Sequence, residues 1–148
     1  MVWGSSADAP VPGDYDGDGK ADLAVYRVRS TGLWQVRQSG TNTLRTATWG
    51  SVGDLPIPRD YDGDGAADIA VYRASTGVWS ILQSSTNALR TVTWGSNSDV
   101  PIPGDYDGDG TIDLAVFRAE HRTLADSAVE HEHPMTLTWG TSTDIPMP

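Results

Sequence analysis

The sequence contains no cysteine, a single phenylalanine and only ten Lys and Arg residues against 20 Asp and Glu. The absence of cysteine excludes disulfides, thiolate metal sites and thiol redox chemistry. The formal net charge of -10 argues against binding to nucleic-acid phosphates or to an anionic membrane surface. No apolar run is long enough to span a membrane or to form a signal peptide, so we expect an exported form to have lost its leader.

The sequence instead consists of one repeated unit. Four Trp-Gly pairs, spaced about 45 residues apart, open units 3–48, 49–93 and 94–138 and a partial fourth unit, 139–148. The units are rich in Gly, Asp, Thr and Val and lack a helical apolar period, which is typical of four-stranded β-propeller blades. The sequence therefore predicts an all-β fold: a single array over residues 1–148 with three four-stranded propeller blades, the third one altered.

The strands of the second unit can be placed from alternation and turn residues. A nearly continuous apolar run over 67–73 predicts a strand buried on both faces. Residues 78–83 and 88–94 predict an outer hairpin, because they are β-favouring and flank a polar turn. Pro56 and Pro58 cannot donate to a ladder, so they mark the start of the inner strand or a sheet edge.

The acidic residues are concentrated in three loops with the pattern DYDGDG, at 14–22, 60–68 and 105–113. Carboxylates occupy positions one, three, five and nine of each loop. Ca²⁺ prefers six to eight oxygen ligands, and glycines let a short loop fold around the ion. We expect about three calcium ions per chain, held by side chains at these positions, a position-seven carbonyl and water. The predicted ligands are Asp14, Asp16, Asp18, Lys20, Asp22, Asp60, Asp62, Asp64, Ala66, Asp68, Asp105, Asp107, Asp109, Thr111 and Asp113.

Other interpretations of the loops fit less well. A single Asp-Gly pair would be simply a good turn, but four confined carboxylates recurring in three copies would repel one another without a cation. An EF-hand needs a bidentate Glu at position twelve, where this chain has Val25, Val71 and Val116. Magnesium is a poorer fit because it keeps its waters and demands a strict octahedron.

Together, the DYDGDG loops, the following ADLAVYR and the TGLW hairpin resemble the FG-GAP or VCBS-type repeats of bacterial surface and secreted proteins, which are related to the integrin α propeller. The resemblance covers the chain except part of the third unit. It implies a β-propeller with calcium in an interstrand loop of each blade, at the ligand positions given above, usually in an extracellular setting. Members of the family act in adhesion, in carbohydrate recognition or as accessory modules, so the resemblance does not imply one activity.

The third unit departs from the pattern in an atypical block, 120–135. A synonymous coding sequence for 120–134, read one base later, encodes STGLWQILQSSTNTL, which is the repeat consensus. We infer a natural or engineered repeat whose reading frame was lost and regained, a hypothesis that the coding DNA tests. The apolar spacing of 123–129 favours a helical turn over a strand, with disorder as an equal alternative. A transition-metal site at His121, His131 and His133, with Glu130 and Glu132, is a weaker interpretation than a solvated charged loop.

Enzymatic activity is disfavoured by the repetition itself. A carboxylate pair could act as in a glycosidase, yet every conspicuous polar group here occurs in triplicate, whereas a catalytic residue is normally unique. We therefore expect a non-enzymatic scaffold or recognition module with a glycan or a protein as its ligand, and a carbohydrate-binding, lectin-like propeller is the alternative. The repeated tryptophans Trp34, Trp49, Trp79 and Trp94 could stack on sugars, but packing between blades is the preferred interpretation.

Three blades are too few to close a propeller, whose rings usually contain four to eight. Residues 3–12 and 139–148 are copies of one segment, which favours a head-to-tail or overlapping contact between chains. We expect a homodimer with six blades, with a higher assembly as the alternative.

Overall fold

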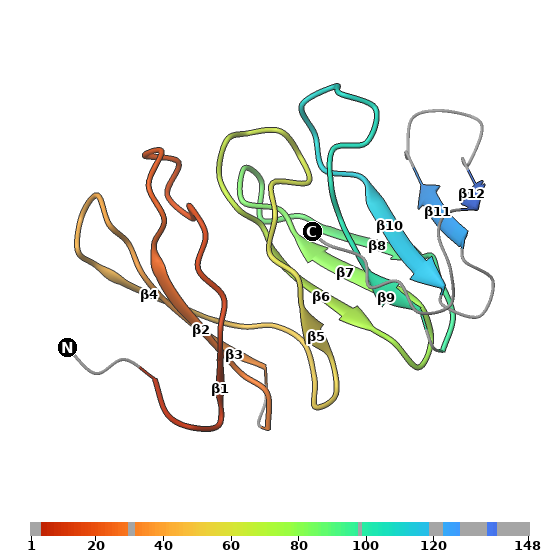
Figure 1. The fold of residues 1–148 in the computed structure, drawn as a ribbon. Coiled ribbons are helices and arrows are strands. Elements are labelled where there is room, and N and C mark those ends of the chain that lie inside the picture. Colours follow the sequence, from red (N-terminus) through yellow and green to blue (C-terminus); the bar gives the residue numbers. More distant parts are fainter. Residues whose placement is uncertain (1–3, 30–31, 98, 119–122, 128–135, 139–148) are drawn as a thin grey trace.

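The computed structural model describes the chain except residues 1–3, 30–31, 98, 119–122, 128–135 and 139–148. The described residues form twelve β-strands and no helix (Figure 1). They accordingly contain no helix that could cross a membrane. The predicted all-β class is confirmed.

Each repeat unit forms one antiparallel four-stranded sheet with its strands in chain order. The first sheet consists of β1 (Asp8–Pro10), β2 (Leu23–Arg27), β3 (Leu33–Arg37) and β4 (Leu44–Thr48). The second consists of β5 (Leu55–Pro56), β6 (Ile69–Arg73), β7 (Val78–Leu82) and β8 (Leu89–Thr93). The third consists of β9 (Val100–Pro101), β10 (Leu114–Arg118), β11 (Thr123–Ser127) and β12 (Thr136–Thr138).

The strands predicted for the second unit are present within one or two residues. The predicted apolar strand corresponds to β6, in which four consecutive residues are buried. The predicted outer hairpin corresponds to β7 and β8. The prolines lie at the predicted sheet edge, because β5 pairs only with β6 and contains Pro56. Short edge strands with proline offer few free donors to another chain.

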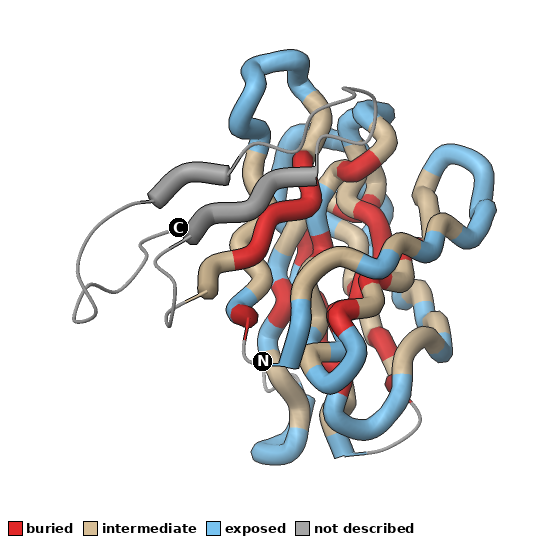
Figure 2. Tube along the Cα trace, turned by 90° about the vertical axis from the view of Figure 1, so that its right-hand side faces the viewer, coloured by how far each residue is buried: buried red, intermediate tan, exposed pale blue. Residues whose placement is uncertain are grey.

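Successive sheets pack face to face, and alternation along β6 explains how. Ile69 and Val71 belong to a core cluster with Tyr26 and Trp34 of the first sheet. Their neighbours Ala70 and Tyr72 point to the opposite face and belong to a cluster with residues of the third sheet. Buried residues follow the middle strands, whereas the connecting loops are exposed (Figure 2). The middle sheet is thus covered on both faces.

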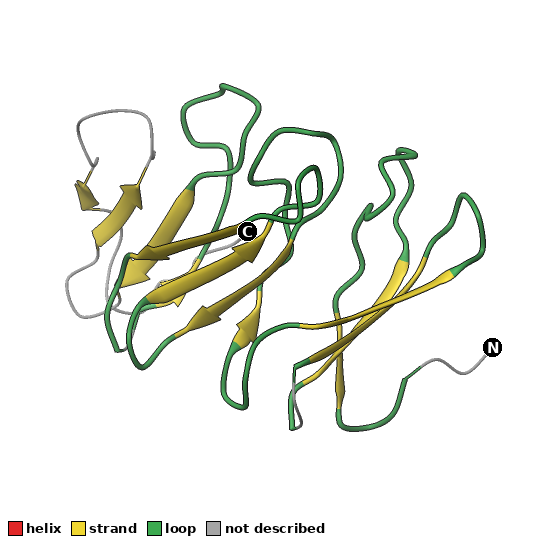
Figure 3. Ribbon diagram, turned by 180° about the vertical axis from the view of Figure 1, so that it is seen from behind, coloured by secondary structure: helices red, strands yellow, loops and turns green. Residues whose placement is uncertain are grey.

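The first strands of the three sheets line a common groove. Its volume is about 810 Å³, and its walls come from the segments that contain β1, β5 and β9. Prolines from every unit line it: Pro10, Pro12, Pro56, Pro58, Pro101 and Pro103. The first strands of the three sheets therefore face one groove. In the first two sheets the outer strands β4 and β8 form the opposite sheet edge (Figure 3).

In the described part of the third unit the expected helical turn is absent. Residues 123–127, for which the apolar spacing favoured a helical turn, form strand β11. This strand pairs with β10 and β12, and Leu124 lies opposite Phe117, in the same register as Trp34 opposite Tyr26. The long edge of β10 supplies hydrogen-bond partners that outweigh the weak local preference of the segment. The altered block thus still forms the third strand of its sheet, but it has Leu124 in place of the tryptophan of the other units.

Candidate metal centre

The three acidic loops connect the first and second strands of their sheets and project from the same end of the molecule (Figure 1). An isolated bridge closes each loop at its base, between Gly13 and Asp22 in the first unit. There the N–H of Asp22 donates to the carbonyl oxygen of Gly13 at 2.7 Å. The ninth position is therefore fixed at the point where the loop returns to the sheet.

The side chains at positions one, three and five converge in the first two loops. Asp14, Asp16 and Asp18 each offer an oxygen atom, and these atoms lie within 4.8 Å of one another. The second loop brings Asp60, Asp62 and Asp64 together in the same way. Two oxygens that bind one calcium ion at 2.3–2.6 Å lie at most about 5 Å apart. The donor set and its spacing therefore fit a calcium ion.

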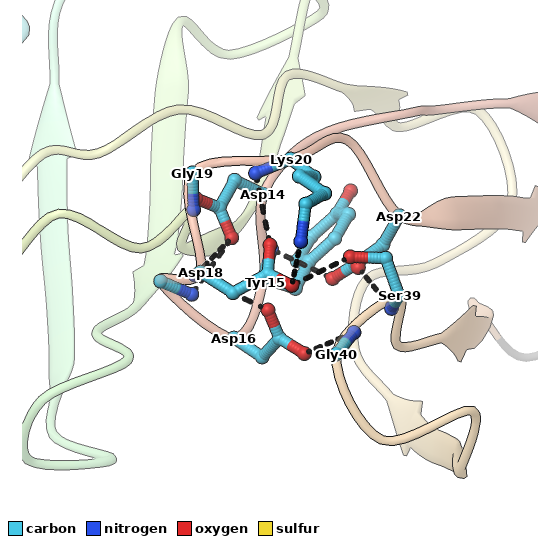
Figure 4. A network of polar contacts seen from close by, with 10 residues as sticks. Asp14, Tyr15, Asp16, Asp18, Gly19, Lys20, Asp22, Ser39 and Gly40 are labelled. Atoms are coloured by element: carbon cyan, nitrogen blue, oxygen red, sulfur yellow. Dashed lines mark hydrogen bonds and ion pairs between the residues drawn. The ribbon is translucent and has the colours of Figure 1, made fainter.

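The first aspartate also organises its own loop (Figure 4). Asp14 Oδ1 accepts hydrogen bonds from the N–H groups of Gly17 at 2.7 Å and Asp18 at 3.2 Å, and Oδ2 accepts from Gly19 at 2.7 Å. Gly17 and Gly19 have φ angles of 73° and 82°, which disfavour residues with a Cβ. Glycine at these places lets the chain curl around the carboxylate.

The ninth aspartate lies apart from the convergent group in these two loops. Both oxygens of Asp22 accept backbone N–H groups, from Tyr15 at 2.9 Å and from Ser39 at 2.6 Å. The two oxygens of Asp68 likewise accept the backbone N–H groups of Tyr61 and Ser84. Burial raises the pKa of Asp68, although these two N–H groups oppose the shift. The ninth carboxylate thus ties the acidic loop to the following hairpin turn.

Serines of that hairpin turn hold the acidic side chains from outside the loop, a role that the sequence analysis missed. Ser84 Oγ donates to Asp64 at 2.8 Å, and Ser85 Oγ donates to Asp62 at 2.6 Å. In the first unit Ser39 Oγ donates to Asp18 at 3.0 Å. The sequence did contain a signal for these serines, because Ser39 and Ser84 occupy equivalent places in consecutive units.

The first loop differs from the second by a lysine at position seven. Lys20 Nζ lies 3.6 Å from Asp18 Oδ2, and its side chain is largely exposed. Desolvation raises the pKa of Asp18, but hydrogen bonds from the Lys20 N–H and from Ser39, together with the charge of Lys20, lower it overall. Because the ammonium group must be displaced or share the carboxylate, we expect this loop to bind cations more weakly. The position-seven carbonyls remain predicted ligands.

In the third loop a different set of three aspartates converges. Asp105, Asp107 and Asp113 bring their oxygens within 4.8 Å, so position nine replaces position five. Val129 and Glu130 stand in the sequence where the second unit has Ser84 and Ser85, and both lie outside the described residues. The histidines and glutamates considered for a transition metal at 121 and 130–133 also lie outside the described residues.

A second set of carboxylates has buried side chains that form ion pairs with partly exposed arginines, and the sequence analysis missed these pairs too. Arg73 Nε and Nη2 donate to the two oxygens of Asp54 at 2.7 and 2.9 Å. The pairs Arg27–Asp8 and Arg118–Asp99 repeat this arrangement. The hydrogen bonds from Arg27 and Arg118 lower the pKa of Asp8 and of Asp99, respectively. These pairs join the start of the first strand of each sheet, or the residue just before it, to the end of the second strand.

No family model, curated protein or solved structure matches this chain.

Proposed function

We propose that this chain is a non-enzymatic, calcium-binding propeller-type repeat module that acts as a scaffold or recognition domain. The observation that carries the proposal is the convergence of three carboxylates in each of the three loops. In the part of the chain with described side chains, every aspartate belongs either to an acidic loop or to an arginine pair. The loop carboxylates would hold Ca²⁺, which would neutralise their mutual repulsion.

The packing supports a propeller-type arrangement of the sheets. The sheets pack face to face in chain order, and their first strands line one groove, as the inner strands of propeller blades line a central channel. The resemblance of the DYDGDG loops and of the segments after them to FG-GAP repeats supports the same arrangement and an extracellular setting. We propose that further sheets from a second chain complete the ring.

Scaffolding is favoured over carbohydrate binding by the tryptophans. Trp34 and Trp79 are fully buried, and their Nε1 groups donate to the carbonyls of Trp49 and Trp94. Trp49 Nε1 in turn donates to the carbonyl of Ser80 in the next sheet at 3.1 Å. These side chains hold sheets together, which supports their interpretation as packing residues.

Asp62→Asn should remove one calcium site. The substitution keeps the size of the side chain but weakens one of three converging ligands, so calorimetric titration should count about two sites in place of about three. Glu120→Gln is the matched control, because it removes the same charge outside the loops and should leave the count unchanged. A full set of sites in Asp62→Asn would contradict the assignment of the second loop.

A further inference from the structure

One end of the array exposes a side chain that the internal junctions bury. Leu23, Ile69 and Leu114 occupy equivalent places at the start of the middle strands β2, β6 and β10. Ile69 and Leu114 are 2% and 0% exposed, because each belongs to a core cluster shared with the preceding sheet. Leu23 is 53% exposed. Val25, two residues along the same face, is 7% exposed, so the uncovered part of the first sheet lies at the Leu23 end of β2.

The opposite end exposes the complementary side chain. Tyr15 and Tyr61 are 2% and 3% exposed, and each shares a core cluster with the residue of the next sheet that corresponds to Leu23. Tyr106, their equivalent in the third unit, is 46% exposed. Tyrosine on one side and an aliphatic residue on the other, Ile69 or Leu114, thus meet at each internal junction, and the equivalent side chain is exposed at each end.

A main-chain hydrogen bond also recurs at the internal junctions. The carbonyl of Asp14 accepts from the N–H of Ala67 at 2.6 Å. One unit later, the carbonyl of Asp60 accepts from the N–H of Ile112 at 3.2 Å. The matching groups at the two ends of the array are the carbonyl of Asp105 and the N–H of Ala21. The two ends therefore present the counterparts of the side chains and main-chain groups that meet at the internal junctions.

We propose that a second copy of this chain docks head to tail on these faces. Leu23 of one copy packs against Tyr106 of the other, and the Ala21 N–H donates to the Asp105 carbonyl. The inference rests on the proposed function in one respect, the propeller-type arrangement. Because the two faces differ, the contact is heterologous, and two such contacts between two chains close a ring of six sheets. That number lies within the usual range for propellers.

The junction between copies should be weaker than the internal junctions. Tyr26 Oη and Tyr72 Oη donate to the carbonyls of Ser51 and Ser96 in the next unit, at 3.3 and 3.5 Å. The third unit has Phe117 at this place, so it lacks the hydroxyl for the corresponding bond to whatever follows its sheet. We therefore expect the assembly to dissociate on dilution before the sheets unfold.

The test uses two interface variants and one control, measured by light scattering in calcium. Leu23→Asp and Tyr106→Ser should each reduce the mass from two chains to one, since each disrupts one side of both junctions. Leu44→Asp should leave two chains, because Leu44 and its equivalent Leu89 are similarly exposed, at 52% and 59%, whether or not a preceding sheet is present. Circular dichroism checks that all three variants fold.

Mixing the two interface variants decides the geometry. In a head-to-tail pair, Leu23→Asp and Tyr106→Ser chains still form one intact junction, so the mixture should regain a mass of two chains. A symmetric contact of Leu23 faces would leave Tyr106→Ser dimeric and the mixture unrescued, and would overturn the proposal. A wild-type monomer would overturn it too. Calorimetry on the same samples separates this failure from failure of the proposed function, because a monomer that still binds calcium retains the cation sites.

Discussion

Removal of divalent cations with a chelator should lower the melting temperature of this chain by more than about 10 °C. A ligand that binds only the folded state at one hundred times its dissociation constant stabilises it by about 2.7 kcal/mol per site. With three acidic loops the effects add, and each kcal/mol shifts the melting temperature of a chain of this size by about 2–4 °C. Thermal melts followed by circular dichroism measure the shift.

The loop structure explains why the effect should be large. Without a cation, the converging oxygens of Asp60, Asp62 and Asp64 repel one another in the folded state. Excess calcium should restore the original melting temperature, whereas equal ionic strength from sodium chloride should not. A melting temperature that does not respond to the chelator would mean that the backbone N–H groups alone stabilise these loops as turns.

Arg73→Met should destabilise the chain by about 3 kcal/mol. The Asp54 side chain is 2% exposed, and the substitution removes both of its guanidinium hydrogen bonds. A buried charge that loses its partner is strongly destabilising, and the value lies at the low end of the usual range because Arg73 is half exposed and the Ser51 N–H still donates to Asp54. Urea unfolding in calcium measures the change.

Two further variants test the cause of that loss. Arg37→Met serves as the matched control, because Arg37 Nε donates only to exposed Asn42, and we expect a change within about 0.5 kcal/mol. The double variant Arg73→Met with Asp54→Leu should regain much of the stability, since no buried charge remains. If the double variant were as unstable as the single variant, lost packing of the arginine stem would be the cause.

The repeat pattern allowed most of the fold to be predicted, because each strand has a local signature. The apolar run before Arg73 predicted a strand buried on both faces, and the face-to-face packing of the sheets accounts for that burial. The prolines predicted the edge strands. Strand β11 was not predicted, because its pairing depends on the free edge of β10 and not on its own composition.

The candidate site was predictable in outline. Alternate carboxylates in a glycine-rich loop indicated that Asp14, Asp16 and Asp18 converge, and they do. The contacts of Asp22 with Ser39 were not predictable, because they join residues from separate connections of the sheet. The arginine pairs likewise depend on strand register, which the sequence pattern did not specify.

Calorimetric titration of the chain with calcium tests the central claim most directly. We expect saturable binding at about three sites per chain, the first loop being weaker than the second because of Lys20. Magnesium at the same concentrations should bind more weakly, since it keeps its waters and demands octahedral geometry. Absence of saturable calcium binding would contradict the account and would leave the acidic loops as turns.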